Sequence, residues 1–238
     1  IIYINITNNL LNIILGELIS IQINKMKKKS LINYWNNYYG NVKILKESSF
    51  ARFTMKFIGK NRKEKKIIDI GCGNGRDSFY FYKKKLSFLG VDISRKIIKN
   101  NSIYSTKKIR IKNFDIEKNT LTEKFDFIYS RFFLHAISEV AENKLFKLIN
   151  KIKKKKTLVF FEFRNKKDPI FKNIKLKKNN KLVEFEKGHF RRIIDDKKFL
   201  KKIKTKLNLK IKYNKSSKNL SIVKNDNPNL TRIILEII

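Results

Sequence analysis

The chain has few of the residues that build several common kinds of site. Its 238 residues include one cysteine, two histidines and two prolines. A single cysteine excludes a disulfide framework and a cysteine-rich zinc site. Neither His135 nor His189 has a carboxylate at a metal-ligand spacing, so we predict no metal site. The low cysteine content is compatible with a reducing compartment, and we expect a cytoplasmic protein.

Acidic residues are also scarce, with 20 Asp and Glu against 57 Lys and Arg, a formal net charge of +37. Such a charge is typical of proteins that bind nucleic acid or an anionic membrane surface. However, 47 of the basic residues are lysines, and 37 isoleucines and 27 asparagines accompany them, while there are only three alanines. Lys, Ile and Asn have AT-rich codons. The charge can therefore reflect a biased genome or selection for a polyanion, and the composition favours the first.

A long membrane-spanning run is absent as well. Residues 1–25 are apolar but contain five asparagines and a glutamate, which would be costly in a bilayer. They also lack the basic start and clean apolar run of a signal peptide. The first methionine is Met26, so we interpret 1–25 as translated upstream sequence or an extension outside the folded domain. We expect 26–60 to be an N-terminal helical lid segment and 61–238 the main domain.

The chain is 42% hydrophobic, which excludes a disordered basic tail. Short apolar runs alternate with helical patterns along it. We predict strands at 67–70, 86–91, 109–114, 125–129 and 157–163, with helices at 31–58, 76–85, 95–103 and 139–152. A later helix at 195–207 and strands at 209–213 and 232–238, separated by a loop at 216–229, complete the order. The Lys- and Asn-rich segment 164–194 is read as an insertion after the fifth strand. This alternation predicts a doubly wound, mostly parallel α/β sheet of seven strands.

Three of the eight glycines follow the first predicted strand directly. Gly71, Gly73 and Gly75 form a GxGxG loop, which allows a sharp turn and a close approach of the backbone to a ligand. Asp92 ends the second predicted strand, where a carboxylate can bind both hydroxyls of a ribose. A glycine loop alone is weak evidence. Together with Asp69 before it and Asp92 after it, the loop indicates a cofactor site.

Asp69, the glycine loop and Asp92 resemble motif I and the second-strand acid of class I S-adenosylmethionine (SAM) methyltransferases. The resemblance covers about 60–238 and implies the Rossmann-like fold of that family, with SAM as the cofactor. It implies that Asp92 binds the ribose, that Asp115 contacts the adenine amine, and that the end of the fourth strand faces the transferred methyl group. The cofactor-binding residues that it implies are Asp69, Gly71, Cys72, Gly73, Asn74, Gly75, Arg76, Asp77, Asp92, Ile93, Asp115, Ile116 and Ser130.

The segments 71–78 and 34–39 resemble the small-molecule branch of that family, which includes the thiopurine and tellurite-resistance types. The segments 48–51, 131–137, 161–164 and 189–192 resemble a bacterial methyltransferase group whose members are often found near surface-polysaccharide genes. The resemblance therefore implies a small acceptor, and we expect methylation at oxygen.

The acceptor side of the predicted site contains both histidines and most of the informative arginines. His135 follows the fourth strand, where a general base could face the acceptor, although it could equally pack or cap a helix. His135 and Arg131 are the candidate catalytic residues. A guanidinium can bind phosphate or carboxylate through two parallel hydrogen bonds, which suggests an anionic acceptor. The candidate acceptor-binding residues are Tyr38, Arg164, His189, Arg191 and Arg192.

Other interpretations stay open at this stage. Cys72 is better explained as a packing residue than as a nucleophile. Asp92 could cap a helix, Asp115 could be an ordinary loop carboxylate, and the aromatic segment 34–39 could be core or lid. The charge keeps an RNA or ribosomal methyltransferase as an alternative, although the segment 130–133 lacks the Asn/Asp-Pro-Pro-aromatic signature that holds a flipped base. A SAM-binding module without transfer activity is the other alternative.

Overall fold

The computed structural model describes residues 14, 15, 18, 22, 25–39, 46–60, 62–101, 105–172, 183–222 and 226–238. Most of the segment 1–25, interpreted above as lying outside the folded domain, is not among the described residues. The same holds for 173–182 within the predicted insertion. In the described part of the chain, no helix combines the length and the apolar character that crossing a bilayer requires.

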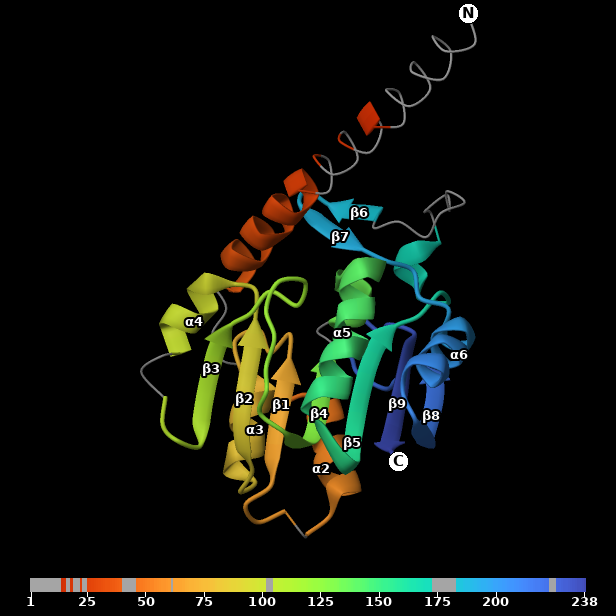
Figure 1. Cartoon of the computed structure of the whole chain (residues 1–238). Helices are drawn as coiled ribbons and strands as arrows, with labels where there is room; N and C mark the ends of the chain where they lie inside the picture. The colour runs from red at the N-terminus through yellow and green to blue at the C-terminus, as the bar shows by residue number, and fades with distance from the viewer. Residues whose placement is uncertain are drawn as a thin grey trace, which may run out of the picture.

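Seven strands form one sheet in the order β3-β2-β1-β4-β5-β9-β8 (Figure 1). The strand β9 is antiparallel to both of its neighbours, and the other pairs are parallel. The predicted mostly parallel, seven-stranded, Rossmann-like sheet is therefore confirmed. Its strands are β1 (Lys66–Ile70), β2 (Ser87–Asp92), β3 (Ile109–Asn113), β4 (Phe125–Arg131), β5 (Lys153–Arg164), β8 (Leu209–Ser217) and β9 (Leu230–Ile237).

Helices cover both faces of the sheet because successive strand residues point to opposite sides. Ile68 and Ile70 of β1 lie in one buried cluster with α5 (Glu139–Ile152) and α6 (Asp196–Lys206). Ile67, which precedes them on the strand, belongs to a second cluster with α2 (Ser49–Ile58) and α3 (Arg76–Lys83). The helix α4 (Arg95–Asn101) contacts β2 and β3. Buried apolar residues on both faces explain the continuous apolar runs of the central strands.

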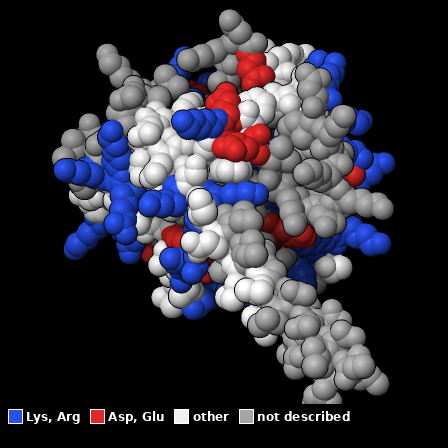
Figure 2. Space-filling model, turned by 90° about the horizontal axis from the view of Figure 1, so that it is seen from above, with Lys and Arg blue, Asp and Glu red and all other residues white. Residues whose placement is uncertain are grey.

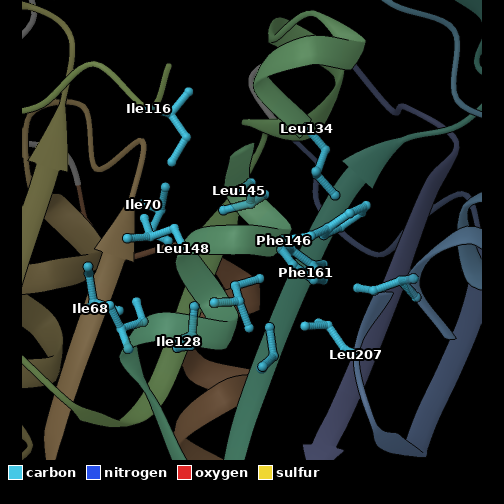
Figure 3. Packing of buried hydrophobic residues seen from close by; sticks show 14 of the residues in the cluster. Ile68, Ile70, Ile116, Ile128, Leu134, Leu145, Phe146, Leu148, Phe161 and Leu207 are labelled. Carbon is cyan, nitrogen blue, oxygen red and sulfur yellow. The ribbon is translucent and has the colours of Figure 1, made fainter. Parts of the chain in front are cut away.

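The helix α5 shows how local sequence and packing agree. It begins after Ser138, whose side chain accepts a hydrogen bond from the Ala141 N–H, and its first turn carries acidic residues that suit the helix dipole. Leu145 and Leu148 point toward the residues of β1 (Figure 3). Each large apolar side chain buried in this way contributes about 1.5–3 kcal/mol to folding. The predicted helix at 139–152 is confirmed at both ends.

Several predicted boundaries differ from the structure. The helix predicted at 31–58 is interrupted: residues 25–39 are helical, 46–48 are not, and 40–45 lie outside the described residues. The break has a local cause, because Ser48 caps α2 by accepting from the Ala51 N–H. The strand β5 begins at Lys153, four residues before the predicted start at 157, and β8 continues into the predicted loop.

The predicted insertion contains regular structure. Its described part includes a short 3-10 turn at Pro169–Phe171 and a hairpin made of β6 (Val183–Glu186) and β7 (His189–Arg191). The hairpin lies beside the helical segment 25–39, above the carboxyl ends of the parallel strands (Figure 1). The two contact each other directly, since a Cβ on Gly188 of the hairpin turn would lie 2.9 Å from the Ser30 Oγ. Together they cover the end of the sheet where the predicted site residues lie.

Candidate functional site

A cavity of about 1570 Å³ lies at the carboxyl ends of β1, β2 and β4, beneath the segment 25–39 and the hairpin. Most of the predicted site residues line it: Asp69, Gly71, Cys72, Asn74, Arg76, Asp77, Asp92, Ile93, Asp115, Ile116, Arg131, Tyr38, Arg164, His189 and Arg191. Five predicted residues are not in its lining: Gly73, Gly75, Ser130, His135 and Arg192. One open space therefore joins the predicted cofactor residues to most of the predicted acceptor residues.

The glycine loop between β1 and α3 folds back on the end of β2. The Gly71 and Cys72 N–H groups both donate to the Val91 carbonyl, at 2.9 and 3.1 Å. Gly71 has a φ of +78° and Gly73 a φ of +54°, a region that other residues enter at a cost. A Cβ on Gly71 would lie 2.6 Å from Phe133 Cδ2, and one on Gly73 would lie 2.5 Å from the Tyr39 hydroxyl oxygen. Both the turn and its neighbours therefore require glycine.

Two backbone donors fix the Asp92 carboxylate at the edge of the cavity. The Gly73 N–H donates to its Oδ2 at 3.0 Å, and the Ser94 N–H donates to its Oδ1 at 2.9 Å. Burial raises the pKa of Asp92, and these hydrogen bonds offset part of that effect by stabilising the charged form. Each oxygen keeps lone-pair capacity beyond its one donor, so the carboxylate can accept further hydrogen bonds from a ligand.

Asp69 and Asp77 differ in what their carboxyl groups contact. Asp69 is 2% exposed and accepts a hydrogen bond from the Ser78 hydroxyl at 2.7 Å. Burial raises its pKa to about 8, and the charges of Asp77 and Asp92 add to the effect. Asp77 instead accepts from the Ser48 N–H and hydroxyl, both at 2.7 Å, and from the Tyr129 hydroxyl at 2.8 Å. Asp77 therefore ties α2 to the sheet, and most of its hydrogen-bonding capacity is used for that purpose.

Asp115, predicted to contact an adenine amine, is paired with the segment above it. The Lys28 ammonium lies 2.8 Å from Asp115 Oδ2 and 2.5 Å from Glu117 Oε2. Further along the same segment, Asn36 Oδ1 accepts from the Ser94 hydroxyl at 2.7 Å. These contacts hold the segment 25–39 down on the ends of β2 and β3. The sequence offered no signal for the role of Lys28, because it stands in a run of lysines.

Three of the predicted acceptor-side arginines are paired with carboxylates, although Arg131 shares its partner, Glu162, with Arg232. Arg131 Nε donates to Glu162 at 2.8 Å. Arg164 forms ion pairs with Asp168, at 3.0 Å, and with Asp226. Arg192 is 7% exposed and pairs with Glu142 on α5, away from the cavity lining. The expectation that Arg192 binds the acceptor is therefore corrected: burial of its charge required a fixed partner inside the protein.

His135 and Ser130 also hold structural positions. The His135 side chain has no exposed surface, and its Nδ1 accepts from the Arg164 N–H at 3.2 Å. Burial lowers its pKa well below the usual value, and the nearby Arg191 and Arg164 lower it further. Since His135 does not line the cavity, its geometry gives no support to its predicted role as a general base. Ser130 donates its hydroxyl to the Ile70 carbonyl at 2.9 Å, which links β4 to β1.

His189 and Arg191 stand apart from this paired set. The His189 ring stacks on Tyr34 with a centroid distance of 4.3 Å and meets Trp35 edge-on at 5.3 Å. Among the described residues, neither the two His189 ring nitrogens nor the Arg191 Nε have a hydrogen-bond partner. Tyr38 stacks on Tyr34 at 6.1 Å and is half exposed at the cavity edge. The aromatic segment 34–39 therefore lines the cavity.

Sequence reasoning missed two residues after β4. Phe132 and Phe133 both line the cavity, and Phe132 adopts a φ of +56°, which is uncommon for a residue with a large side chain. The Arg131 guanidinium lies 4.0 Å from the Phe132 ring centroid. Position alone could have indicated them, since they follow directly on a parallel strand that ends at the site.

A family model described as a methyltransferase domain matches residues 44–213. The chain belongs to this family. A search of curated proteins finds no match. Solved structures show the fold: a SAM-dependent methyltransferase from Methanosarcina mazei is 16% identical, with a TM-score of 0.62, over 77% of this chain and 97% of that one. The strand order and this likeness confirm the predicted class I methyltransferase fold.

Two further structures resemble this methyltransferase in fold. A 1,6-didemethyltoxoflavin-N1-methyltransferase from Burkholderia thailandensis is 10% identical, with a TM-score of 0.60, over 79% of this chain and 76% of that chain. A glycopeptide N-methyltransferase, MtfA, is 8% identical, with a TM-score of 0.60, over 82% and 96% of the two chains. Neighbours with different acceptors share the fold, so the fold does not identify the acceptor.

Proposed function

We propose that this methyltransferase transfers the methyl group of SAM to a small, anionic acceptor at oxygen. The observation that carries the cofactor assignment is the Asp92 carboxylate, which Gly73 and Ser94 fix at the edge of the cavity beside a loop that has no side chains at 71 and 73. Two of the structural neighbours are described with S-adenosylhomocysteine or SAM bound, which supports the same cofactor.

The residues present fit that cofactor. Asp92 would accept hydrogen bonds from the two ribose hydroxyls. Asp115 would accept one from the adenine amine while its carboxylate stays paired with Lys28. Ile93 and Ile116 supply apolar cavity walls between these two carboxylates. When bound, SAM supplies a methyl group that its sulfonium already activates. The protein therefore has to orient the acceptor and exclude water, and the segment 25–39 with the hairpin covers the cavity in a way that suits both tasks.

The proposed acceptor is small because the segment 25–39 and the hairpin cover much of the cavity and limit what can enter it. This agrees with the small-molecule branch and with the surface-polysaccharide-associated group that the sequence resembles. The end of β4 reads Ser130-Arg131-Phe132-Phe133, without the signature of enzymes that methylate the amino group of a base, which argues against a nucleic-acid acceptor. Methylation at oxygen is part of the proposal and is tested by the turnover screen below. RNA remains the competing acceptor. Figure 2 shows basic side chains at the edges and in the middle of this end of the molecule, with acidic groups among them rather than one continuous basic surface.

Calorimetry tests the cofactor site. Asp92→Asn removes a charge that would accept hydrogen bonds from two ribose hydroxyls, so we expect SAM to bind about tenfold more weakly or worse. Asp196→Asn is the matched control, because Asp196 lies in the first turn of α6 outside the cavity lining. Equal SAM affinity in Asp92→Asn and the parent protein would show that the site assignment is wrong.

A turnover screen tests the acceptor. The assay couples hydrolysis of S-adenosylhomocysteine to detection and covers small carboxylates, sugar phosphates, nucleotide sugars, thiols and RNA. Turnover on a small anionic molecule is the expected result. Turnover on RNA alone, with a steep loss of binding as salt rises, would replace the proposal with the nucleic-acid alternative. Tight SAM binding with no turnover on any class would favour a binding module without transfer activity.

A further inference from the structure

The two acceptor-side residues without internal partners lie on one strand. His189 and Arg191 are separated by one residue in β7, so alternation along the strand directs their side chains to the same face. Both line the cavity. The hairpin is held in place by the Gly188 N–H, which donates to Glu184 Oε1 at 2.7 Å, and by the close contact of its turn with Ser30. A rigid element therefore presents both groups to the same space.

His189 is buried in a way that leaves its polar atoms unused. It is 3% exposed, Tyr34 and Trp35 pack on its ring, and Phe185 meets it edge-on with a centroid distance of 6.0 Å. Its Nδ1 is 3.7 Å from Glu186 Oε2, which is beyond hydrogen-bond distance. Buried polar atoms without hydrogen-bond partners are uncommon and cost stability. The unpaired nitrogens of this imidazole, which lines a cavity, are best explained by a ligand that forms hydrogen bonds with them.

Arg191 has no ion pair with a carboxylate of the described residues. Asp168 and Glu186 act on it only from beyond ion-pair distance, and its guanidinium lies 5.8 Å from the Phe185 ring centroid. Burial lowers the pKa of Arg191 to about 10, and the positive charge of Arg164 adds to the effect. The guanidinium is thus a partly desolvated cation beside the cavity. An anion bound in the cavity would offset both the cost of its burial and its repulsion from Arg164.

From this arrangement, and on the basis of the function proposed above, we infer that Arg191 and His189 bind a carboxylate group of the methyl acceptor. Arg191 offers a planar fork that matches the two oxygens of a carboxylate, and His189 donates a ring N–H to one of them. The tyrosine stacked on His189 belongs to the segment 25–39.

The charge balance favours a carboxylate over a phosphate. Arg164 faces two carboxylates, Asp168 and Asp226, and so has no spare positive charge. His189 is uncharged at neutral pH, because burial, Arg191 and Arg164 lower its pKa to about 3. Arg191 therefore supplies a single positive charge to the ligand. A carboxylate matches that charge, whereas the second negative charge of a phosphate dianion would have to be met by a cation other than Arg191, such as the exposed Lys29 of the cavity lining.

Fluorine NMR on the full-length chain saturated with S-adenosylhomocysteine tests this inference. The probes are para-fluorobenzoate, para-fluorophenyl phosphate and the uncharged para-fluorobenzamide, titrated near neutral pH. We expect the benzoate to bind most tightly of the three. Tighter or equal binding of the phosphate, or no detectable binding of the benzoate, overturns the assignment of a carboxylate site.

Matched variants localise the site. We expect Arg191→Gln to weaken benzoate binding about tenfold or more, because it removes a charge-assisted hydrogen-bonding pair. Arg191→Lys keeps the positive charge but loses the two parallel N–H donors, so its affinity for benzoate should lie between those of the parent protein and Arg191→Gln. His189→Phe keeps the stacking and removes the N–H, so it should also weaken binding, and His189→Gln should restore part of it. The control is Arg95→Gln, an exposed arginine at the start of α4.

Binding of S-adenosylhomocysteine, measured on the same samples, distinguishes a failure of the carboxylate site from a failure of the proposed function. Each variant should retain the parent's affinity for it, which also shows that the variant is folded. If benzoate binding is unchanged in Arg191→Gln while this affinity is retained, the carboxylate site is refuted and the proposed function stands. If the parent protein itself fails to bind S-adenosylhomocysteine, the proposed function is refuted.

Discussion

Replacing Asp69 by asparagine should stabilise the protein at neutral pH. Asp69 is 2% exposed at the end of β1, and burial raises its pKa from 3.8 to about 8. The folded state therefore holds a proton that the unfolded state releases near pH 4. Asparagine has nearly the same shape, carries no charge and can still accept the hydrogen bond from the Ser78 hydroxyl. The substitution removes the electrostatic cost and keeps the contact.

The magnitude follows from the displaced pKa. Between the unfolded value, 3.8, and the folded value, about 8, the folded state of the parent binds more protons than the unfolded state. Its stability therefore falls as pH rises through that window, by about 1.4 kcal/mol for each pH unit. At pH 7 the accumulated cost of Asp69 is about 4 kcal/mol. The Asp69→Asn variant would carry no such cost. Its free energy of unfolding should therefore equal that of the parent in acid and exceed it by about 4 kcal/mol at pH 7.

Urea unfolding of the parent and of Asp69→Asn, measured at a series of pH values, gives the difference in unfolding free energy directly. Asp126→Asn is the control with the opposite sign. Burial alone would raise the pKa of Asp126, but the Lys66 N–H and the ammonium groups of Lys154 and Lys65 outweigh it and lower the pKa. Its substitution should therefore cost stability at neutral pH. A difference for Asp69→Asn that stays flat with pH, or that favours the parent, refutes the reasoning.

Three further variants test the lid and the site. Gly73→Ala should lose about 1–3 kcal/mol of stability and bind SAM more weakly, because φ is +54° and the added Cβ would clash; thermal unfolding and calorimetry measure both. Lys28→Met should speed amide hydrogen exchange in the segment 25–39 more than Lys29→Met does, because Lys28 forms ion pairs with Asp115 and Glu117. Equal exchange rates in the two variants would show that these ion pairs do not hold the segment in place. His135→Gln should lower the melting temperature and leave the pH–rate profile in place, whereas loss of the acidic limb of the profile, where a required base becomes protonated, would restore its role as a base.

The cofactor side of the site could be predicted because it is local. Gly71 and Gly73 take up positive φ angles that few other residues tolerate, so their presence in a chain with only eight glycines marks a turn with a purpose. Asp92 stands at the end of the next strand, and parallel strands bring their carboxyl ends to the same edge. Short-range sequence therefore placed the loop and the carboxylate together before any tertiary contact was known.

The acceptor side could not be read in the same way. Arg164, Arg191 and Arg192 are the same residue type within a short stretch, yet Arg164 and Arg192 form ion pairs with carboxylates, whereas no carboxylate of the described residues lies within ion-pair distance of Arg191. The partner of Arg192 is Glu142, 50 positions earlier in the chain. Whether a guanidinium is free for a ligand depends on such distant partners, which no local pattern reports.

The sequence by itself determined the alternation of strands and helices, the glycine loop and the acid that follows β2, because backbone conformation and strand order depend on local residue types. Only the tertiary structure decided that His135 is a buried hydrogen-bond acceptor and that Lys28 pairs with Asp115 and Glu117. It also decided that His189 and Arg191 line the cavity, with no hydrogen-bond partner among the described residues for the His189 ring nitrogens and Arg191 Nε. The physical reason is that burial and charge pairing are properties of the packed molecule, set by residues that are far apart in the chain.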